Sequence, residues 1–333
     1  MALKIAINGF GRIGRCVARI AASRDDVEIV AINDMASMDM MLYLLKNDSV
    51  HGTFNSSIEQ IDDENISIDG QNIRVFSDRN PKNLKFADCG ADMVLECTGV
   101  FLTQESAQVH IDNGVEKVLF SAPSKDTETD TFVMGVNEDL YAGQKIVSNA
   151  SCTTNCLGPV AKVLDDAFGI EKGLMTTIHS YTNDQNILDV KHSKDKRRGR
   201  AGAINMIPTT TGAAKAISLV MPQLKGRLHG QSVRVPTPDV SMVDLNVVVK
   251  KETTKEEVTR VFNEAADGRL KGLLLMDKEM RVSQDFVGSQ YSSIVAEDLT
   301  QVIGGDMVKI MAWYDNEWGY SMRLVDMALH ISK

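Results

Sequence analysis

The sequence predicts a two-domain α/β protein, in which a mostly parallel N-terminal sheet is followed by an α+β domain with a mixed, largely antiparallel sheet. A chain of 333 residues is longer than one hydrophobic core usually serves. Its first part alternates apolar strands with helices, whereas residues 240–250 alternate apolar and polar side chains, as in an antiparallel strand. We expect domains at 1–150 and 151–316, and a C-terminal helix at 317–333 that packs back on the first domain.

Composition is that of an ordinary globular protein, with 43% hydrophobic and 24% charged residues. A formal net charge of -9 argues against a general affinity for nucleic acid or an anionic membrane. Five cysteines do not indicate a disulfide framework and fit a reducing compartment. Because there is no basic leader or long apolar run, we expect a cytoplasmic protein without membrane attachment.

The first predicted strand, Leu3 to Asn8, runs into the segment 9–14, Gly-Phe-Gly-Arg-Ile-Gly. Such glycines permit a tight turn and close approach of the backbone to a pyrophosphate, and the helix that follows offers N–H donors. A second strand, Val27 to Asn33, ends at Asp34, whose carboxylate can accept from ribose hydroxyls and repels a 2'-phosphate. The pattern predicts a Rossmann-type domain that binds NAD; a coincidental glycine turn is the alternative.

The rest of this domain is predicted as a helix followed by short strands. A helix is expected over 37–48, a tight hairpin over 66–75 around Asp69-Gly70, and strands over 93–96, 117–120, 132–136 and 145–147. Thr98-Gly99 and Ser121 come directly after two of these strands, at the edge where ligands bind in open α/β sheets.

Cys152 stands at the start of a predicted helix, whose apolar residues Leu157, Val160 and Leu164 share one face. Free N–H groups and the helix dipole favour an anion there, so we expect a lowered pKa for this thiol and a nucleophilic role. The plain alternative is a buried cysteine beside an ordinary helix cap. No Cys/His cluster has the spacing of a zinc site, and no metal is predicted.

The second half places a histidine and a hydroxyl-rich helix start near the end of predicted strands. His179 lies in a strand over 174–181, and Thr209 to Gly212 precede a helix over 213–220, which makes a natural anion site. Between them, residues 191–200 form the most basic segment. A solvated or subunit-facing loop is favoured there over a nucleic-acid patch, because no aromatic residues are interleaved. Further elements are a capped helix beginning at Thr254 and a strand over 308–314 followed by a terminal helix.

Six segments together closely resemble the phosphorylating glyceraldehyde-3-phosphate dehydrogenases. They occur in order along the whole chain: 7–15 (INGFGRIGR), 149–155 (NASCTTN), 177–185 (TIHSYTNDQ), 211–215 (TGAAK), 234–238 (RVPTP) and 313–320 (WYDNEWGY).

The resemblance implies NAD-dependent oxidation of D-glyceraldehyde 3-phosphate to 1,3-bisphosphoglycerate, in glycolysis or gluconeogenesis. Cys152 is then the thiolate that attacks the aldehyde, and His179 raises its reactivity and removes the hydroxyl proton. The resulting thioester keeps the acyl group activated until inorganic phosphate attacks it.

The resemblance also assigns binding residues and implies a homotetramer. Residues expected to bind the cofactor are Gly9, Gly11, Arg12, Ile13, Gly14, Asp34, Arg79, Ser121 and Asn316. Residues expected to bind the substrate phosphate are Thr182 and Arg234, and those for inorganic phosphate are Ser151, Thr153, Thr211 and Gly212, assisted by Arg198. Asp239 departs from the family, which often has asparagine there.

Two alternatives follow from the same residues. An erythrose-4-phosphate dehydrogenase uses the same Cys/His pair but passes the acyl group to water. A nucleic-acid-binding or adhesion protein that kept the fold without the chemistry is suggested by the basic segment. The intact set of Cys152, His179 and Asp34 argues against it as the main role.

Overall fold

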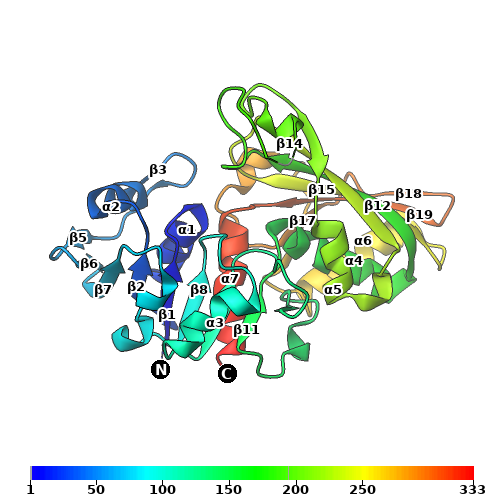
Figure 1. Ribbon diagram of the computed structural model, residues 1–333. Helices are drawn as coiled ribbons and strands as arrows, with labels where there is room; N and C mark the ends of the chain where they lie inside the picture. The colour runs from blue at the N-terminus through cyan, green and yellow to red at the C-terminus, as the bar shows by residue number, and fades with distance from the viewer. Residues whose placement is uncertain (1, 194) are drawn as a thin grey trace. The chain divides into compact units, whose positions relative to one another are not determined.

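The computed structural model describes residues 2–193 and 195–333 (Figure 1). Lys194, part of the predicted basic segment, lies outside the described residues. The chain divides into two compact units. The first comprises Met1–Phe132, Glu138–Ser151 and Ser321–Lys333, and the second comprises 133–137 and 152–320.

The first unit is built on a nine-stranded sheet in the order β10-β11-β9-β8-β1-β2-β7-β6-β5. Its strands are β1 (Leu3–Asn8), β2 (Val27–Asn33), β5 (Ile58–Gln60), β6 (Asn65–Ile68), β7 (Gln71–Phe76), β8 (Met93–Glu96), β9 (Lys117–Phe120), β10 (Asp130–Thr131) and β11 (Ile146–Ser148). Pairing is parallel from β10 through β7, and only β7-β6-β5 is antiparallel. The predicted mostly parallel sheet is confirmed.

Helices of the first unit follow strands, as the alternating pattern predicts. They are α1 (Arg12–Ala21), α2 (Met38–Lys46) and α3 (Gln104–Asp112), while α7 (Trp318–Ile331) contributes its residues from Ser321 onward. Ser37 caps α2, accepting from the backbone N–H of Met40. A short ribbon, β3 (Asn47–Asp48) with β4 (Gly52–Thr53), follows α2. The interior is apolar, with Val17 and Ile20 of α1 buried.

The predicted hairpin is confirmed and one predicted strand is wrong. Asp69 and Gly70 have φ of 50° and 83°, the left-handed pair that a tight hairpin turn requires. Residues 132–136, in contrast, are not a strand. The N–H of Val133 donates to Oδ1 of Asn137 (2.9 Å), and Gly135 has φ of 80°, so the backbone turns instead of pairing.

The second unit is built on an eight-stranded mixed sheet in the order β13-β14-β12-β15-β19-β17-β16, with β18 beside β19. Its strands are β12 (Ile170–Ser180), β13 (Ile207–Thr210), β14 (Leu228–Val235), β15 (Ser241–Val249), β16 (Leu274–Asp277), β17 (Ser293–Ala296), β18 (Gln301–Ile303) and β19 (Met307–Tyr314). Pairs β12/β14 and β16/β17 are parallel and the others antiparallel. This confirms the predicted mixed sheet.

Three helices, α4 (Cys152–Phe168), α5 (Ala213–Val220) and α6 (Lys255–Asp267), gather on the same side of this sheet (Figure 1). The alternation over 240–250 is confirmed as β15, whose Val243, Leu245 and Val247 are buried. Among the described residues, no helix combines the length and apolar character that crossing a membrane requires.

The start of α5 differs from the prediction. Thr209 and Thr210 belong to β13, where they pair with Ser232 and Gln231 of β14, so they do not cap the helix. Only the hydroxyl of Thr211 acts there, accepting from the N–H of Ala213 (3.2 Å). Strands β13, β14, β16, β17 and β18 had no clear signal in the sequence, since their apolar alternation is short or interrupted.

Candidate active site

Cys152 and His179 meet where several strands of the second unit end. Strands β12 and β14 are parallel, and β19 runs in the same direction because it is two antiparallel steps from β12. Their carboxyl ends therefore share one edge of the sheet. His179 and Arg234 are register partners near the ends of β12 and β14, and Tyr314 is the last residue of β19.

Cys152 is the first residue of α4, as the sequence predicts. Its Sγ lies 3.6 Å from Nε2 of His179, which is 27 residues away in the chain. Period-two alternation along β12 buries Met175, Thr177 and His179 on the same face of the strand. Sulfur and imidazole are therefore within reach of a proton transfer.

Arg234 fixes the other side of the imidazole. Its Nη1 lies 2.7 Å from Nδ1 of His179 and donates to the carbonyl oxygen of Ser180 (3.1 Å), which itself lies 2.7 Å from Nδ1. One nitrogen cannot both accept from Arg234 and donate to Ser180. For Nε2 to act as a base, Nδ1 must carry the proton and donate it to the carbonyl oxygen of Ser180. The lone pair of Nε2 then faces Cys152.

The expectation that the pKa of the Cys152 thiol is lowered is wrong. Burial raises the pKa of Cys152 above its usual range, whereas Arg234 and the hydroxyl and N–H of Thr153 lower it without prevailing. Burial and the Arg234 charge lower the pKa of His179 to about 3, so the imidazole is neutral. The helix start does favour the thiolate, but the cost of desolvating a charge is larger.

A buried hydroxyl chain behind Cys152 was missed by sequence reasoning. Oη of Tyr314 lies 2.8 Å from Oγ1 of Thr153 and 2.8 Å from Oγ1 of Thr177. Tyr314 is 1% exposed and Thr153 is also buried. These hydroxyl contacts connect the first turn of α4 to β12 and β19. They join residues 137 and 161 positions apart, which no local sequence pattern predicts.

Asn316 is held in one orientation. Its Oδ1 accepts from Oγ of Ser180 (2.8 Å) and from Oγ of Ser241 (2.6 Å). With the oxygen engaged by these two hydroxyls, the NH₂ group is the end that can donate to a ligand. Ser180 and Ser241 are further residues that the sequence did not single out.

Residues expected around inorganic phosphate lie in two places. Ser151 and Thr153 flank Cys152, although the Thr153 hydroxyl is engaged by Tyr314. Thr211 is partly buried and Gly212 exposed at the N-terminus of α5. A Cβ at Gly212 would meet nothing within 4 Å, which leaves room for an anion at this helix start.

Within the basic segment, His192, Arg198 and Arg200 lie beside acids. Nη1 of Arg198 lies 3.1 Å from Oδ2 of Asp184, and its Nε donates to Oγ1 of Thr209 (2.9 Å). Arg198 also donates to the carbonyl oxygen of Thr210 (3.3 Å), one residue before Thr211. Oγ1 of Thr182 accepts from the N–H of Asp184 (3.4 Å). Arg198 is thus directed at the strand that leads to α5.

In the first unit, the three glycines of the predicted turn have three different roles. Gly9 has φ of 95°, and a Cβ there would lie 2.7 Å from the Thr98 nitrogen. A Cβ on Gly14 would lie 2.3 Å from the Gly9 oxygen, so α1 packs against the turn. A Cβ on Gly11 would meet nothing within 4 Å, so the protein itself gives no steric reason for glycine. This open backbone fits the close approach of a pyrophosphate.

The other cofactor candidates lie near the same strand ends. The N–H groups of Phe10 and Ala36 donate to Asp34 (2.7 and 2.9 Å), which orients its carboxylate at the end of β2. Arg12 forms a two-point ion pair with Asp48, its Nη2 lying 3.1 Å from Oδ1. The remaining three candidates are Ile13 at the start of α1, Arg79, which is exposed after β7, and Ser121 directly after β9. The donor set fits a dinucleotide.

Asp239 is a buried carboxyl beside the catalytic strands. It is 2% exposed, and a carboxyl oxygen of Asp239 and one of Asp315 lie within 4.8 Å of each other. Burial and the charges of Asp315 and Glu317 raise the pKa of Asp239 to about 9. It therefore carries a proton at neutral pH, as the asparagine amide often found here would carry N–H groups.

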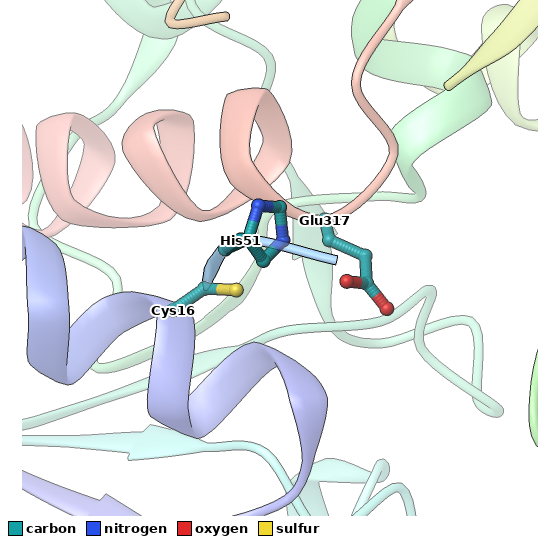
Figure 2. Close-up of side chains that lie close together, drawn as sticks. All are labelled: Cys16, His51 and Glu317. Atoms are coloured by element: carbon teal, nitrogen blue, oxygen red, sulfur yellow. The ribbon is translucent and has the colours of Figure 1, made fainter. Parts of the chain in front are cut away.

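A second thiol–imidazole pair lies in the first unit. Cys16 on α1 and His51, which follows α2, point toward one another, with sulfur and a ring nitrogen within 4.8 Å (Figure 2). Cys16 is 2% exposed. Cys16 is therefore buried, whereas Cys152 is partly exposed.

Comparison with known proteins gives a consistent result. The family model "Glyceraldehyde 3-phosphate dehydrogenase, NAD binding domain" matches residues 3–104, and the C-terminal domain model of the same family matches 151–316. Glyceraldehyde-3-phosphate dehydrogenase of Geobacillus stearothermophilus is 52% identical over 334 residues, covering 100% of this chain and 99% of the relative. Glyceraldehyde-3-phosphate dehydrogenase 1 of Bacillus subtilis is 51% identical over 335 residues, with the same coverage. A chloroplastic relative from Chlamydomonas reinhardtii is 52% identical, covering 98% of this chain and 88% of the relative.

Proposed function

Since the chain belongs to the glyceraldehyde-3-phosphate dehydrogenase family, we propose that Cys152 carries the acyl group as a thioester and that inorganic phosphate releases it. The protein is an NAD-dependent oxidoreductase that acts on glyceraldehyde 3-phosphate. The erythrose-4-phosphate alternative is not favoured by the relatives found. The observation that carries the proposal is the 3.6 Å between Sγ of Cys152 and Nε2 of His179.

In the first step, Sγ of Cys152 bonds to the aldehyde carbon. Nε2 of His179 takes the thiol proton and passes it to the carbonyl oxygen, which becomes the hydroxyl of a thiohemiacetal. When bound, NAD supplies the acceptor for the hydride that leaves this carbon. His179 removes the hydroxyl proton in that step, which the lone pair on a neutral imidazole allows.

In the second step, a phosphate oxygen attacks the thioester carbon. The carbon–sulfur bond breaks, the product is an acyl phosphate, and Cys152 leaves as the thiolate. Arg234 stabilises that thiolate through its charge, as does the N–H of Thr153. Oxidation energy is thereby conserved in the product.

Two anion sites serve this chemistry in our proposal. Arg234, next to the imidazole, and Thr182 bind the phosphate of the substrate. The second site, for inorganic phosphate, consists of Ser151, Thr153, Thr211 and Gly212, with Arg198 assisting. Its support is the open start of α5 and the position of Arg198 beside Thr210. For Thr153, the N–H is the group available, because Tyr314 engages the hydroxyl.

Cofactor binding is proposed at the glycine turn. The backbone at Gly9, Gly11, Arg12, Ile13 and Gly14 faces the pyrophosphate, and Asp34 accepts from the adenosine ribose. Arg79 and Ser121 line the adenosine side, and the NH₂ group of Asn316 donates to the carboxamide of the nicotinamide.

We also propose a division of labour, an assembly and a compartment. Residues 1–150 bind NAD, residues 151–316 carry the chemistry, and the helix over 317–333 completes the first domain. The compartment we propose is the cytoplasm, and the assembly is a homotetramer, as the resemblance implies. Support for subunit contacts is that the segment between β12 and β13 exposes large apolar side chains. These are Ile187, Leu188, Ile204 and Met206, each at least 75% exposed. Light scattering of an Ile204→Glu variant tests the assembly, since a smaller particle is expected.

Turnover with and without inorganic phosphate tests the proposed reaction. Strong phosphate dependence with glyceraldehyde 3-phosphate is expected, and indifference to phosphate contradicts the acyl-transfer step. A second comparison uses erythrose 4-phosphate, which is expected to be the poorer substrate. Replacing Cys152 by Ser should lower turnover at least about 10⁴-fold and leave NAD affinity unchanged. Mapping iodoacetamide labelling with and without substrate should show protection at Cys152.

A further inference from the structure

A line of buried polar side chains crosses the carboxyl ends of three strands in the first unit. Asn33 ends β2, Asn8 ends β1 and Glu96 ends β8, and they are 5%, 0% and 0% exposed. Nδ2 of Asn33 donates to Oδ1 of Asn8 (2.8 Å), and Nδ2 of Asn8 donates to Oε2 of Glu96 (2.6 Å). Such a row of polar groups costs free energy to bury, so its retention calls for a physical reason.

The side chain at each end of this row, Glu96 at one and Asn33 at the other, forms hydrogen bonds to a loop. Oε1 of Glu96 accepts from the N–H of Thr98 (2.8 Å) and also from the Thr98 hydroxyl. At the other end, Nδ2 of Asn33 donates to the carbonyl oxygen of Asp78 (3.1 Å), and Oδ1 of Asn33 accepts from the N–H of Asp78 (3.0 Å). Asp78 directly precedes Arg79. The row therefore connects the loops after β7 and β8.

The glycine turn lies between these loops and depends on their positions. The N–H of Gly9 donates to the carbonyl oxygen of Asn33 (2.8 Å), and the N–H of Cys97 donates to that of Asn8 (2.7 Å). Thr98 lies so close that a Cβ on Gly9 would be 2.7 Å from its nitrogen. A shift of Thr98 would consequently displace the turn itself.

His110 on α3 completes the cluster from the side. It is 0% exposed, and its Nε2 lies 3.7 Å from Oε2 of Glu96, beyond hydrogen-bond distance. Its ring stacks on Phe86, with centroids 5.8 Å apart, and meets Phe101 edge-on. The imidazole therefore packs beside the Glu96 carboxylate on the side of α3.

We infer that Glu96 is a positioning residue for the dinucleotide, whose carboxylate holds Asn8 and Thr98 together and so keeps the glycine turn in its binding conformation, with His110 packed beside it. The inference rests on the proposed cofactor site at this turn. Glu96 acts on cofactor affinity through the backbone and does not touch the reacting atoms.

The test is NAD binding by Glu96→Gln, which keeps the shape of the side chain but replaces one acceptor oxygen with an NH₂ group. Either Asn8 or Thr98 then loses its acceptor. We expect the Kd for NAD to rise about tenfold, as for loss of a hydrogen bond to a charged group, with kcat at saturating NAD within about twofold of wild type. The matched control is Glu105→Gln, which removes an exposed carboxylate from α3 and should leave both values unchanged.

A double-mutant cycle tests His110. His110→Phe keeps an aromatic ring against Phe86 and removes both nitrogens, so we expect the Kd to rise about threefold. In the double variant with Glu96→Gln the carboxylate that His110 packs against is already gone, and the Kd should equal that of Glu96→Gln alone. Multiplying effects would overturn the role of His110.

Two further variants distinguish a wrong positioning role for Glu96 from a wrong cofactor site. Thr98→Val removes one donor with little change of shape, and should weaken NAD binding about threefold even if Glu96→Gln fails to fold. Gly11→Ala tests the proposed cofactor site directly. If Gly11→Ala loses NAD while Glu96→Gln and Thr98→Val bind it normally, the positioning role is wrong and the site stands. If Gly11→Ala binds NAD normally, the site and the inference both fall.

Discussion

The glycine turn at 9–14 and the pair of Cys152 and His179 are built in opposite ways. Gly9, Gly11 and Gly14 lie within six residues, and their roles follow from backbone geometry alone. Cys152 and His179 are 27 residues apart and meet because β12 ends beside the start of α4. Their environment comes from still more distant strands through Arg234 and Tyr314.

The difference shows which kind of site a sequence reveals. A contiguous backbone turn carries its spacing in the chain, so its residues and their roles can be predicted together. In an assembled site, the residue types can be predicted, but their pKa values depend on what the fold packs around them. The raised pKa of Cys152 is an example, since burial outweighs the helix start that the sequence does show.

Among variants that keep the Cys152 thiol, the largest effect is expected from His179→Asn. Removing the base should lower kcat about 10³-fold, because general base catalysis contributes roughly 10²–10⁴-fold. The Kd for NAD should stay within about twofold of wild type, since His179 belongs to the second unit. Steady-state kinetics and calorimetric titration of NAD measure the two. A large loss of NAD affinity would show that NAD binding is not independent of His179.

Gly11→Ala and Gly14→Ala test the glycine turn, as His179→Asn tests the other region. Gly11→Ala should raise the Kd for NAD at least about tenfold without changing stability, because its methyl group meets only the space proposed for the pyrophosphate. Gly14→Ala should destabilise the protein by about 3 kcal/mol, because its methyl group would lie 2.3 Å from the Gly9 oxygen.

Urea unfolding without NAD separates the two glycine variants. Cys152 alkylation serves as the control, and its rate should be that of wild type in Gly11→Ala. Equal destabilisation by both substitutions would show that the turn is a packing element only.

A smaller effect is expected from Arg234→Gln on the pH profile of Cys152 alkylation. The positive charge of Arg234 favours the thiolate, so its loss should raise the thiol pKa further and move the midpoint up by about one pH unit. Arg260→Gln, an exposed substitution on α6, is the matched control. A downward shift would mean that Arg234 acts mainly by suppressing protonation of His179.

The smallest effect is expected from Asp239→Asn. In the unfolded chain Asp239 ionises near pH 4, whereas in the folded protein it keeps its proton up to about pH 9. Folding therefore binds a proton, and stability falls as pH rises through this window. The asparagine variant avoids that cost and should be about 1–3 kcal/mol more stable at pH 8, with no gain at pH 4. Urea midpoints at the two pH values measure this, and a gain that does not depend on pH would argue against a protonated Asp239.

Most of the parallel sheet could be predicted because its strands are apolar runs that end at loops. β1 and β2 have the predicted bounds, and α4 begins at Cys152. The predicted strand over 132–136 failed because its apolar residues Phe132, Val133 and Val136 pack around a turn at Gly135. Apolar composition is the same for a buried turn and a buried strand, so only the backbone conformation distinguishes them.

By itself, the sequence determined the α/β class, the glycine turn with its acid at Asp34, and the choice of Cys152 and His179 as the candidate nucleophile and base. These depend on spacing along the chain or on residue type. Only the tertiary structure decided that Tyr314 closes a hydroxyl chain behind Cys152, that Ser180 and Ser241 orient Asn316, and that Glu96 joins the loops around Gly9. These contacts link strands far apart in sequence, and strand order and register, which local patterns do not encode, bring them together.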